Sequence, residues 1–535
     1  MSDDSQTRNG ADLLLQTLVA NGVTACFANP GTSEMQFVAA LDRAPDMRAV
    51  LCLFEGVATG AADGYARMSG SPAATLLHLG PGYLNGGANL HNARRARSPV
   101  INVVGDHATY HRRFDAPLNS DIAGMARPNS KWVASAESPD DVSRLACEAV
   151  ATSRAKPAGP VTFILPADSA WLSTSTTPCV AAPTAPAAPP IDRIRALADR
   201  FRQSDAPVVL LGGSACGERA LAAASRLARA GARIFTETFV ARQRRGGVHF
   251  APTRLAYFAE AAEAELAGTD LLLLVESQAP VAFFAYPGRA SELTPDGCAV
   301  EVLASPAEDG AAALHALADA LDAPVPQGVD RGAPQAPSPD GDLNAHLAGA
   351  AIARHLPEDA IISDDAVTAG QPIFDATRSA AAHDWLMLTG GAIGQGLPVA
   401  IGAAVACPDR KVVSLNGDGA AMYTVQSLWT LAREQLDVVV VVFANSAYRI
   451  LGVEFTRTGS GDKPGAASRK LLDLGDPLID WVALGQSLGV PSERCVTGEQ
   501  FDRAFAAAIA APGPHLIEAV TGGAGRRAYG GASAG

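Results

Sequence analysis

Residues 416–445 read NGDGAAMYTVQSLWTLAREQLDVVVVVFAN, and this stretch decides the fold. It opens with Gly417-Asp418-Gly419 after an apolar run, and a second, very apolar run from Val438 to Phe443 precedes Asn445. Short β-branched runs on either side of a helical pattern, expected over Thr424 to Glu434, predict a strand–helix–strand unit with parallel strands. Such a crossover brings Asp418 and Asn445 to the same carboxyl edge of a sheet, where α/β folds bind ligands.

The polar groups at this edge suit a hard cation. Mg²⁺ takes oxygen ligands, generally a few from protein together with phosphate groups. The Asp418 carboxylate, the Asn445 amide oxygen and the Ala447 carbonyl fit that pattern, and Gly417 and Gly419 let the backbone approach a diphosphate. A lone Gly-Asp-Gly is a common turn, and the dinucleotide fingerprint would need a third glycine that is missing here. The sequence therefore favours a magnesium–diphosphate site.

A second candidate, Glu55, lies far away in the chain. It follows Leu51-Cys52-Leu53-Phe54, which predict a buried strand, and precedes a helical run of small residues from Gly56 to Met68. A carboxylate in the first turn of a helix is stabilised by the helix dipole, so the residue alone also fits a purely structural role.

Together these segments resemble the thiamin diphosphate (ThDP) enzymes, whose motif is Gly-Asp-Gly followed just under thirty residues later by Asn. The resemblance covers essentially the whole chain. Acetolactate synthase large-subunit-like proteins are most similar, and benzoylformate decarboxylase-like enzymes come next. The resemblance implies ThDP and Mg²⁺ as cofactors, with Asp418, Asn445 and Ala447 as metal ligands and Glu55 as the catalytic carboxylate at N1′ of the aminopyrimidine. One departure is Ala444, where the family often has a first asparagine.

Further segments fall in the family's order. Asn29-Pro30-Gly31-Thr32 resembles the loop that faces the reacting carbon, and Gly80-Pro81-Gly82 resembles a loop of acetohydroxyacid synthases. Gly391 and Ile393 lie in the segment that resembles the loop beneath the cofactor. The resemblance implies that the Gly391 carbonyl accepts a hydrogen bond from the 4′-amine of the cofactor, and that Ile393 is the apolar side chain that forces the cofactor into its V shape. The implied cofactor-binding set is Glu55, Thr32, Gly391, Ile393, Gly417, Asp418, Gly419, Asn445 and Tyr448.

His78 is the candidate acid–base residue. A lone histidine in an apolar run is ordinarily a buried strand residue bonded to backbone. By the resemblance, however, it falls where benzoylformate decarboxylase-like enzymes place a catalytic histidine, and its pKa range suits proton transfer. Their second histidine has no counterpart near residues 279–285, and Leu451 stands where pyruvate decarboxylase has a glutamate. A simple pyruvate decarboxylase is therefore not expected.

The remaining substrate candidates are polar. Asp106 replaces a glutamine of acetolactate synthases and belongs either to a polar rim near the substrate or to an ordinary exposed loop. Arg449 begins a helix that lines the pocket in relatives and could pair with a substrate carboxylate. The predicted substrate set is Thr32, His78, Asp106 and Arg449. The arginine-bearing segment that helps hold FAD in biosynthetic acetohydroxyacid synthases is missing around residues 275–284, so FAD is not expected.

Length and proline-rich segments predict the domain organisation. A chain of 535 residues is too long for one core, and βαβ patterns recur between the proline-rich stretches. The predicted fold class is α/β, with three doubly wound parallel-sheet domains. The predicted order is a pyrimidine-binding domain (1–172), a linker (173–190), a central domain (191–323), a linker (324–343), a diphosphate- and Mg-binding domain (344–523) and a flexible tail (524–535).

Composition excludes several classes of function. A formal charge of −13 and the lack of any long basic run argue against nucleic acid as a partner. No apolar run is long enough for a membrane span, and the acidic N-terminus is unlike a secretion signal. The eight cysteines show neither close sequence pairs nor metal-ligand spacing, and Cys26 and Cys52 fit reduced core thiols. These features predict a cytoplasmic protein.

The leading functional prediction is a ThDP- and Mg²⁺-dependent carboligase of the acetolactate synthase type. It would decarboxylate a small-molecule 2-oxo acid such as pyruvate and join the product to a second carbonyl. One alternative is a non-ligating decarboxylase or C–C lyase on a bulkier substrate, which Phe283 and Phe284 would suit. Another is a catalytically inactive ThDP-binding partner subunit. Because Glu55 and the metal site come from different subunits in relatives, a homodimer or homotetramer is expected.

Overall fold

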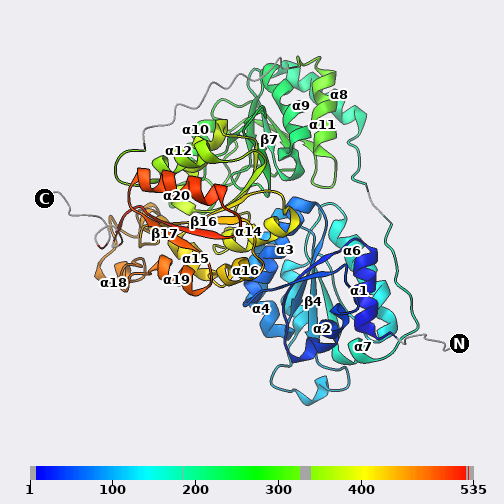
Figure 1. Cartoon of the computed structure of the whole chain (residues 1–535). Coiled ribbons are helices and arrows are strands. Elements are labelled where there is room, and N and C mark those ends of the chain that lie inside the picture. The colour runs from blue at the N-terminus through cyan, green and yellow to red at the C-terminus, as the bar shows by residue number, and fades with distance from the viewer. Residues whose placement is uncertain (1–7, 183–184, 326–338, 524, 526–527, 529–535) are drawn as a thin grey trace.

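The strands of the chain form three sheets. The computed structural model describes residues 8–182, 185–325, 339–523, 525 and 528. Figure 1 shows the sheets as three lobes: the N-terminal one at the lower right, the middle one at the top and the C-terminal one at the left. Among the described strands, every pairing within a sheet is parallel except that of β9 with β14. The predicted α/β class with three parallel sheets is confirmed, whereas the exact domain bounds remain a prediction.

The first sheet has the order β2-β1-β3-β4-β6-β5. Its strands are β1 (Ala25–Asn29), β2 (Arg48–Leu51), β3 (Ala73–Leu77), β4 (Val100–Asp106), β5 (Val133–Ser135) and β6 (Val161–Pro166). Its helices are α1 (Gly10–Ala20), α2 (Met35–Leu41), α3 (Glu55–Ser69), α4 (Leu79–Ala96), α5 (Ile122–Ala126), α6 (Val142–Arg154) and α7 (Ala167–Trp171), with η1 (Thr32–Glu34), η2 (Arg112–Phe114), η3 (Arg127–Asn129) and η4 (Pro139–Asp141). β4 and β6 are buried along their whole length, as expected when helices cover both faces.

One strand prediction in this region is wrong. The strand ends at Leu51, so the predicted buried strand over Leu51 to Phe54 is not formed. Leu53 is 46% exposed. β2 is the edge strand of the sheet, and edge strands are commonly short because only one neighbour supports them.

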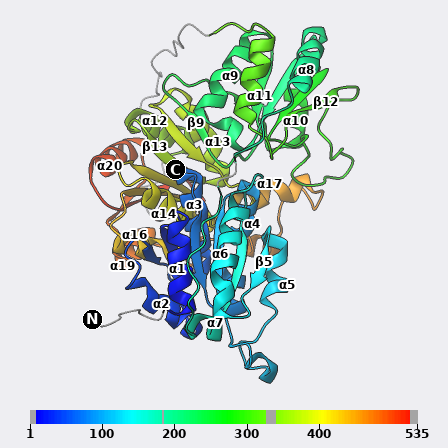
Figure 2. The same ribbon diagram turned by 90° about the vertical axis from the view of Figure 1, so that its right-hand side faces the viewer.

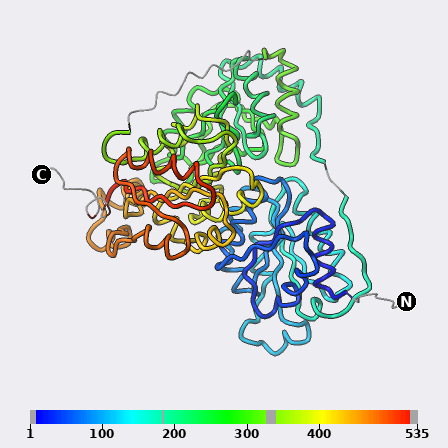
Figure 3. The backbone as a smooth tube through the Cα atoms, viewed as in Figure 1, coloured from blue at the N-terminus to red at the C-terminus, as the bar shows by residue number. Residues whose placement is uncertain are grey.

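The second sheet has the order β10-β8-β7-β11-β12. Its strands are β7 (Pro207–Leu211), β8 (Arg233–Thr236), β10 (Thr253–Arg254), β11 (Leu271–Val275) and β12 (Ala299–Ala304). The helices around it are α8 (Ile191–Gln203), η5 (Gly213–Cys216), α9 (Glu218–Arg229), α10 (Ala259–Leu266) and α11 (Gly310–Ala320). Figure 3 follows the chain from the first lobe to this one along the outside of the molecule.

The third sheet has the order β17-β18-β16-β15-β13-β14-β9. Its strands are β9 (Gln243–Arg245), β13 (Ala360–Asp365), β14 (His383–Leu386), β15 (Val412–Gly417), β16 (Val438–Ala444), β17 (Ser492–Cys495) and β18 (His515–Val520). Its helices are α12 (Ala345–His355), η6 (Val367–Ala369), α13 (Gly370–Ala376), η7 (Thr377–Ser379), α14 (Gly396–Ala406), α15 (Asp418–Tyr423), α16 (Ser427–Arg433), α17 (Arg449–Arg457), α18 (Ala466–Lys470), α19 (Trp481–Ser487) and α20 (Gly498–Ala510). The helix predicted over residues 424–434 corresponds to the shorter helix α16, which α15 precedes.

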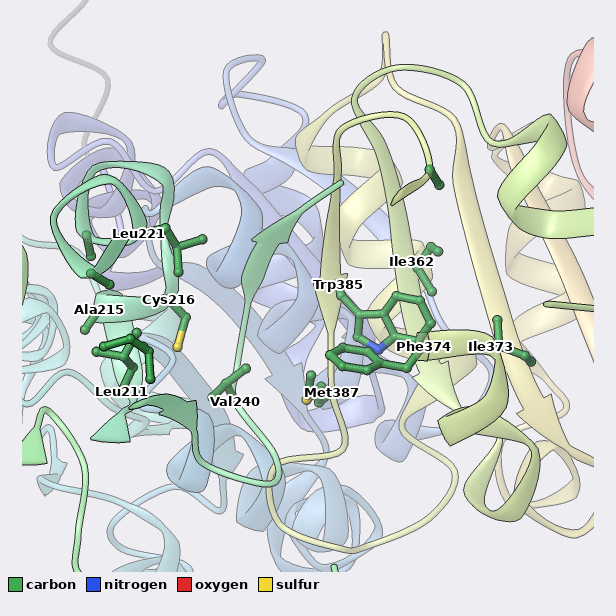
Figure 4. Packing of buried hydrophobic residues seen from close by; sticks show 14 of the residues in the cluster. Leu211, Ala215, Cys216, Leu221, Val240, Ile362, Ile373, Phe374, Trp385 and Met387 are labelled. Atoms are coloured by element: carbon green, nitrogen blue, oxygen red, sulfur yellow. The ribbon is translucent and has the colours of Figure 1, made fainter. Parts of the chain in front are cut away.

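The three lobes share hydrophobic cores. One cluster of buried residues joins the second sheet to the third; Figure 4 shows Leu211 and Cys216 in the same cluster as Ile362 and Trp385. A second cluster joins the first sheet to the third through α3 and α14. Figure 2 gives the side view, with α3 and α14 between the first and third lobes. Across the described residues, no helix combines the length and apolar character of a membrane span.

Candidate active site

His78 lies at the carboxyl edge of the first sheet and is bound by a buried acid. It is the N-cap residue of α4, directly after β3, and its Nδ1 lies 2.8 Å from Oε2 of Glu34. The same Glu34 oxygen accepts a hydrogen bond from the Gly31 amide at 2.8 Å. Burial raises the pKa of the Glu34 carboxyl above its usual value, and His78 opposes that shift. A Cβ on Gly31 would lie 2.2 Å from His78 Nδ1, so this glycine is needed for the close approach.

Glu55 lies next to this pair. It is the first residue of α3 and is 6% exposed, and its Oε2 accepts a hydrogen bond from Asn85 Nδ2 at 2.9 Å. A Cβ built on Gly82 would meet Glu55 Oε1 at 3.2 Å and His78 Cβ at 3.4 Å. Gly82 thus lies close to both predicted catalytic side chains, and Thr32, the first residue of η1, follows Gly31 at the same edge.

Asp106 ends β4 at this edge but is engaged within the chain. Its Oδ2 pairs with Arg112 Nη2 at 2.7 Å, and its Oδ1 accepts from the His107 amide at 2.7 Å. Burial raises the pKa of the Asp106 carboxyl, and Arg112 acts in the opposite direction. Asp106 therefore fixes the loop after β4, and its role as a substrate residue remains a prediction.

The predicted metal ligands lie at the carboxyl edge of the third sheet. Asp418 begins α15 after β15, and Asn445 follows β16. Asp418 is 4% exposed; its Oδ1 accepts from the Gly419 amide at 2.9 Å and its Oδ2 from the Ser446 amide at 2.6 Å. Asn445 Oδ1 accepts from the Ala447 amide at 2.9 Å. One turn thus brings the carboxylate, the amide oxygen and the Ala447 backbone together.

These oxygen ligands suit Mg²⁺, the cation that the sequence implies. Carboxylate, amide and carbonyl oxygens are the ligands that Mg²⁺ prefers, and each carboxylate oxygen of Asp418 keeps a further lone pair beyond its amide bond. The raised pKa of Asp418 follows from its burial, which its backbone hydrogen bonds partly offset. A bound divalent cation would offset the negative charge of this buried acid.

The loop with Gly391 and Ile393 is held by a buried acid that the sequence did not single out. Asp365, at the end of β13, accepts through Oδ2 from the amides of Gly394, Gln395 and Gly396 at 2.8, 3.0 and 3.2 Å. Gly391 has φ +76 and Gly394 has φ +92, a conformation that favours glycine. Burial raises the pKa of the Asp365 carboxyl to about 7. The loop shape is therefore fixed before any ligand binds.

A large cavity opens beside this loop. Its volume is about 1080 Å³, and Gly391, Ile393, Tyr448 and Arg449 line it together with residues of the second lobe. Its apolar lining includes Phe239, Tyr257, Phe283, Phe284, Leu388, Ile450 and Leu451. Tyr448 also packs against Gly419, where a Cβ would lie 2.3 Å from Tyr448 Cε1. The cavity thus adjoins the Asp418 turn.

The structure therefore assembles two half-sites within one chain. Thr32, Glu55 and His78 form the first, at the edge of the first sheet. The second comprises Gly391, Ile393, Tyr448 and Arg449 in the cavity and the adjoining Asp418 turn. None of the three first-half residues lines the cavity formed by the described residues.

Two residues of the candidate site, Glu34 and Asp365, were not identified from the sequence. Glu34 has no pattern of its own, although its place three residues after Gly31 is a signal that could have been used, because a helix-start carboxylate often bonds back to the preceding amide. Asp365 is the last residue of β13, and Asp418 comes directly after the neighbouring strand β15; that parallel could have identified Asp365.

Comparison with known proteins agrees with this geometry. Residues 8–125 match the family model of the thiamine pyrophosphate enzyme N-terminal TPP-binding domain, and residues 369–519 match that of the C-terminal TPP-binding domain. A Mycobacterium tuberculosis protein provisionally named acetolactate synthase large subunit IlvX is 51% identical, over 96% of this chain and 99% of that protein. Benzoylformate decarboxylase of Pseudomonas aeruginosa is 29% identical, over 95% and 97% of the two chains.

Solved structures give the same result. The ThDP-dependent 4-hydroxybenzoylformate decarboxylase of Rhodococcus jostii RHA1 superposes with a TM-score of 0.83 at 27% identity, covering 96% of this chain and 99% of that one. The relatives match over nearly their full length, and both TPP-binding halves are present. The chain therefore belongs to the thiamine pyrophosphate (ThDP)-dependent enzymes, as its sequence motifs predict.

Proposed function

We propose that this enzyme decarboxylates a 2-oxo acid with a bulky apolar side chain, of aryl size, and that the fragment left after CO₂ departs is protonated. The observation that carries the proposal is the apolar lining of the cavity beside Gly391 and Ile393, to which Phe283 and Phe284 contribute. The methyl group of pyruvate would cover little of this surface, whereas an aryl group would cover much of it and gain the corresponding burial free energy.

The residues of the two half-sites suit this reaction. ThDP, when bound, supplies the carbon nucleophile and the electron sink for decarboxylation. Asp418, Asn445 and Ala447 would hold Mg²⁺ with the diphosphate, and Ile393 would pack against the bound cofactor. Glu55 would hold a proton at N1′ of the pyrimidine. Its bond to Asn85 engages Oε2 and fixes the carboxylate, which leaves Oε1 for that contact.

His78 is suited to deliver the proton. With Glu34 ionised, its carboxylate can only accept, so Nδ1 of His78 carries the hydrogen and Nε2 is left to exchange a proton with the substrate fragment. Direct protonation ends the reaction as a decarboxylation.

Carboligation is the second candidate. The 51% identity with a protein provisionally named as an acetolactate synthase large subunit favours it. In that reaction the donor side chain would be small, and the second carbonyl compound would occupy the cavity space that a bulky side chain fills in the first candidate reaction. Arg449, exposed at the start of α17, would be available for the carboxylate of such an acceptor.

Purified enzyme with ThDP and Mg²⁺, given either benzoylformate or pyruvate, tests these candidates. We expect CO₂ with one aldehyde per CO₂ from benzoylformate, and a kcat/KM at least about tenfold above that for pyruvate, the size of effect that one hydrophobic pocket contributes. Acetolactate from pyruvate would contradict the proposal and establish the carboligase. Bound ThDP without turnover of any 2-oxo acid would favour an inactive partner subunit.

A matched pair of variants connects the result to the cavity. Phe284→Ala removes a cavity-lining ring, and Phe114→Ala removes an exposed ring of η2 that does not line the cavity. We expect Phe284→Ala to lower kcat/KM for benzoylformate about tenfold and Phe114→Ala to leave it unchanged. An equal loss of kcat/KM in both variants would show that the cavity does not determine substrate choice.

A further inference from the structure

Glu276 adopts a backbone conformation that is unusual for its residue type. It follows β11 with φ +52, in the left-handed region that glycine tolerates and side chains with a Cβ generally avoid. It is also a charged residue, and it is only 3% exposed. Strain of this kind persists when the surroundings hold the residue in place for a purpose.

The Glu276 carboxylate is surrounded by donors from two lobes. Ser214 donates its amide to Oε2 at 2.9 Å and its hydroxyl to Oε1 at 2.6 Å. The Gly310 amide, at the start of α11, donates to Oε1 at 3.0 Å. Lys156 of the first lobe approaches Oε1 at 3.4 Å, which gives the buried anion a cation.

Glycine backbone forms the walls around this carboxylate. A Cβ on Gly213, which has φ +49, would lie 2.6 Å from Glu276 Oε2, and a Cβ on Gly310 would lie 2.7 Å from Oε1. Glycine-rich turns and helix N-termini at the carboxyl edge of a parallel sheet bind phosphate groups in α/β folds. Here the turn after β7 and the start of α11, which belong to two different strand–helix units, both donate amides to the Glu276 carboxylate.

We propose that Glu276 is an internal anion that occupies the phosphate position of the second sheet and thereby keeps nucleotides, FAD included, out of this lobe. A diphosphate would need the Ser214 and Gly310 amides that the carboxylate already uses. It would also meet a second negative charge at close range, which is unfavourable away from water. The residues present therefore do not fit a flavin or adenine dinucleotide, in agreement with the missing arginine-bearing segment.

The contacts also give Glu276 a role between lobes. Its backbone carbonyl accepts from Arg97 Nη1 at 2.8 Å, and both Arg97 and Lys156 come from the first lobe. A second cavity of about 620 Å³ at this junction is lined by these two cations and by Ser214 and Glu276. With the Glu276 side chain removed, Lys156 would lose its carboxylate partner, and the Ser214 and Gly310 amides would be free to bind an anion.

Glu276→Gly is the direct test because glycine suits φ +52 and removes the carboxylate. Isothermal titration with ADP, and absorbance after incubation with FAD and gel filtration, measure binding to the holoenzyme. We expect the wild type to bind neither at millimolar concentration. We expect Glu276→Gly to bind ADP, in competition with inorganic pyrophosphate.

Glu276→Gln is the matched control, since it keeps the side-chain volume but removes the charge. We expect it to lower Tm and still to bind no ADP. Micromolar binding of FAD or ADP by the wild type overturns the proposal, whatever the variants do. A folded Glu276→Gly enzyme that binds no ADP overturns it as well.

An independent observation concerns two cysteines. Cys147 of α6 and Cys179 lie 32 positions apart in the chain, yet their sulfur atoms are 2.7 Å apart. Cys179 is fixed there, because its amide donates to Ser143 Oγ at 2.8 Å and its carbonyl accepts from Asn21 Nδ2 at 2.8 Å. Cys179 is exposed and Cys147 is buried. A disulfide between them needs a displacement of less than about one ångström.

The geometry points to a redox modification site at Cys147 and Cys179, with a peroxide as the oxidant. The exposed Cys179 sulfur would attack a peroxide oxygen, giving a sulfenic acid and water from hydrogen peroxide. The Cys147 sulfur would then displace the second water and form the disulfide, so that two thiols and one peroxide become one disulfide and two waters. The bond would fasten the segment after the first lobe to α6.

Peptide mass mapping under non-reducing conditions tests this second proposal. After mild hydrogen peroxide treatment of the full chain, we expect a Cys147–Cys179 linked peptide and a fall from eight free thiols to six. Cys179→Ser should abolish that peptide, and Cys407→Ser, which changes a half-buried thiol elsewhere, should leave it intact. Oxidation of other thiols without the linked peptide would overturn the assignment.

Discussion

At the scale of single residues, buried carboxylates shape both half-sites by accepting backbone amides. Asp365 accepts from three amides of the loop that follows Ile393, and Asp418 accepts from those of Gly419 and Ser446. Glu34 does the same for Gly31 and also binds His78. Burying such acids is unfavourable unless they are bonded, so each position carries a definite structural purpose.

Asp365→Asn is expected to change the pH dependence of stability. The pKa of Asp365 is raised from 3.8 to about 7 in the folded chain, so folding binds a proton between these values. The stability that this proton confers is fully present below pH 3.8 and is lost as pH rises towards 7. Asparagine does not titrate, so the free energy of unfolding of the variant should fall less steeply with rising pH than that of the wild type. The two slopes should differ by up to about 1.4 kcal/mol per pH unit.

Urea unfolding of wild type and variant at several pH values between 4 and 8 measures this difference. Gln371→Asn, in α13, is the control: neither side chain titrates, so the pH dependence of the wild type should stay unchanged. Parallel curves for wild type and Asp365→Asn would refute the titration of Asp365 in this range.

Under the proposed mechanism, Glu34→Gln is expected to lower kcat about tenfold while KM stays unchanged, because the proton-transfer step would lose an oriented His78 and substrate binding would not. Steady-state kinetics on the best 2-oxo acid measure it. Glu434→Gln, which breaks the surface ion pair with Arg48, is the matched control and should behave as wild type. An unchanged kcat in Glu34→Gln would show that His78 needs no partner.

At the scale of elements, the contact between α3 and α14 depends on glycine. A Cβ on Gly402 of α14 would lie 1.8 Å from the Ala61 carbonyl oxygen, and one on Gly64 of α3 would lie 2.1 Å from the Val399 carbonyl oxygen. The two backbones therefore touch directly. Since α3 begins with Glu55 and α14 follows the Asp365-bound loop, this contact also fixes how the two half-sites are oriented.

Gly402→Ala should force the two helices apart and lower the free energy of unfolding by about 2 kcal/mol, the range for overpacking a core. Gly452→Ala is the matched control, since Gly452 lies inside α17 with open space around it. That change should be neutral or stabilise by about 0.5–1 kcal/mol through a stiffer unfolded chain. Thermal and urea unfolding measure both variants, and equal effects would contradict the close contact.

Elements with a strong local pattern were predictable, whereas their mutual contacts were not. The run from Val438 to Phe443 lies within β16, and Asp418 follows β15, as predicted. The helix over residues 424–434 was predicted too long, because residues 424–426 form a turn after α15 and α16 begins only at Ser427. The contact of Glu34 with His78 joins residues 44 positions apart, and Glu276 has partners from two lobes, so no local pattern shows these contacts.

At the scale of the whole molecule, the part of the chain that the structure describes carries both half-sites but does not join them in one cavity. Glu55 and His78 belong to the first lobe, and neither lines the cavity beside Ile393. The resemblance to ThDP enzymes implies that the missing half comes from a second copy of the chain. We therefore expect a dimer, or a dimer of dimers, in which each site takes Glu55 from one subunit and Asp418 from the other.

Mixing two inactive variants tests this arrangement. Glu55→Gln removes the predicted pyrimidine contact and Asp418→Asn removes a predicted metal ligand, so each protein alone should lose activity at least about a hundredfold. If the variants are refolded together or co-expressed, half of the dimers contain one copy of each. In such a dimer one shared site carries both changes and the other carries none. The mixture should therefore recover about a quarter of wild-type activity, as expected for two-fold symmetric sites. Recovery of nothing by well-folded mixed dimers would show that each site lies within a single chain.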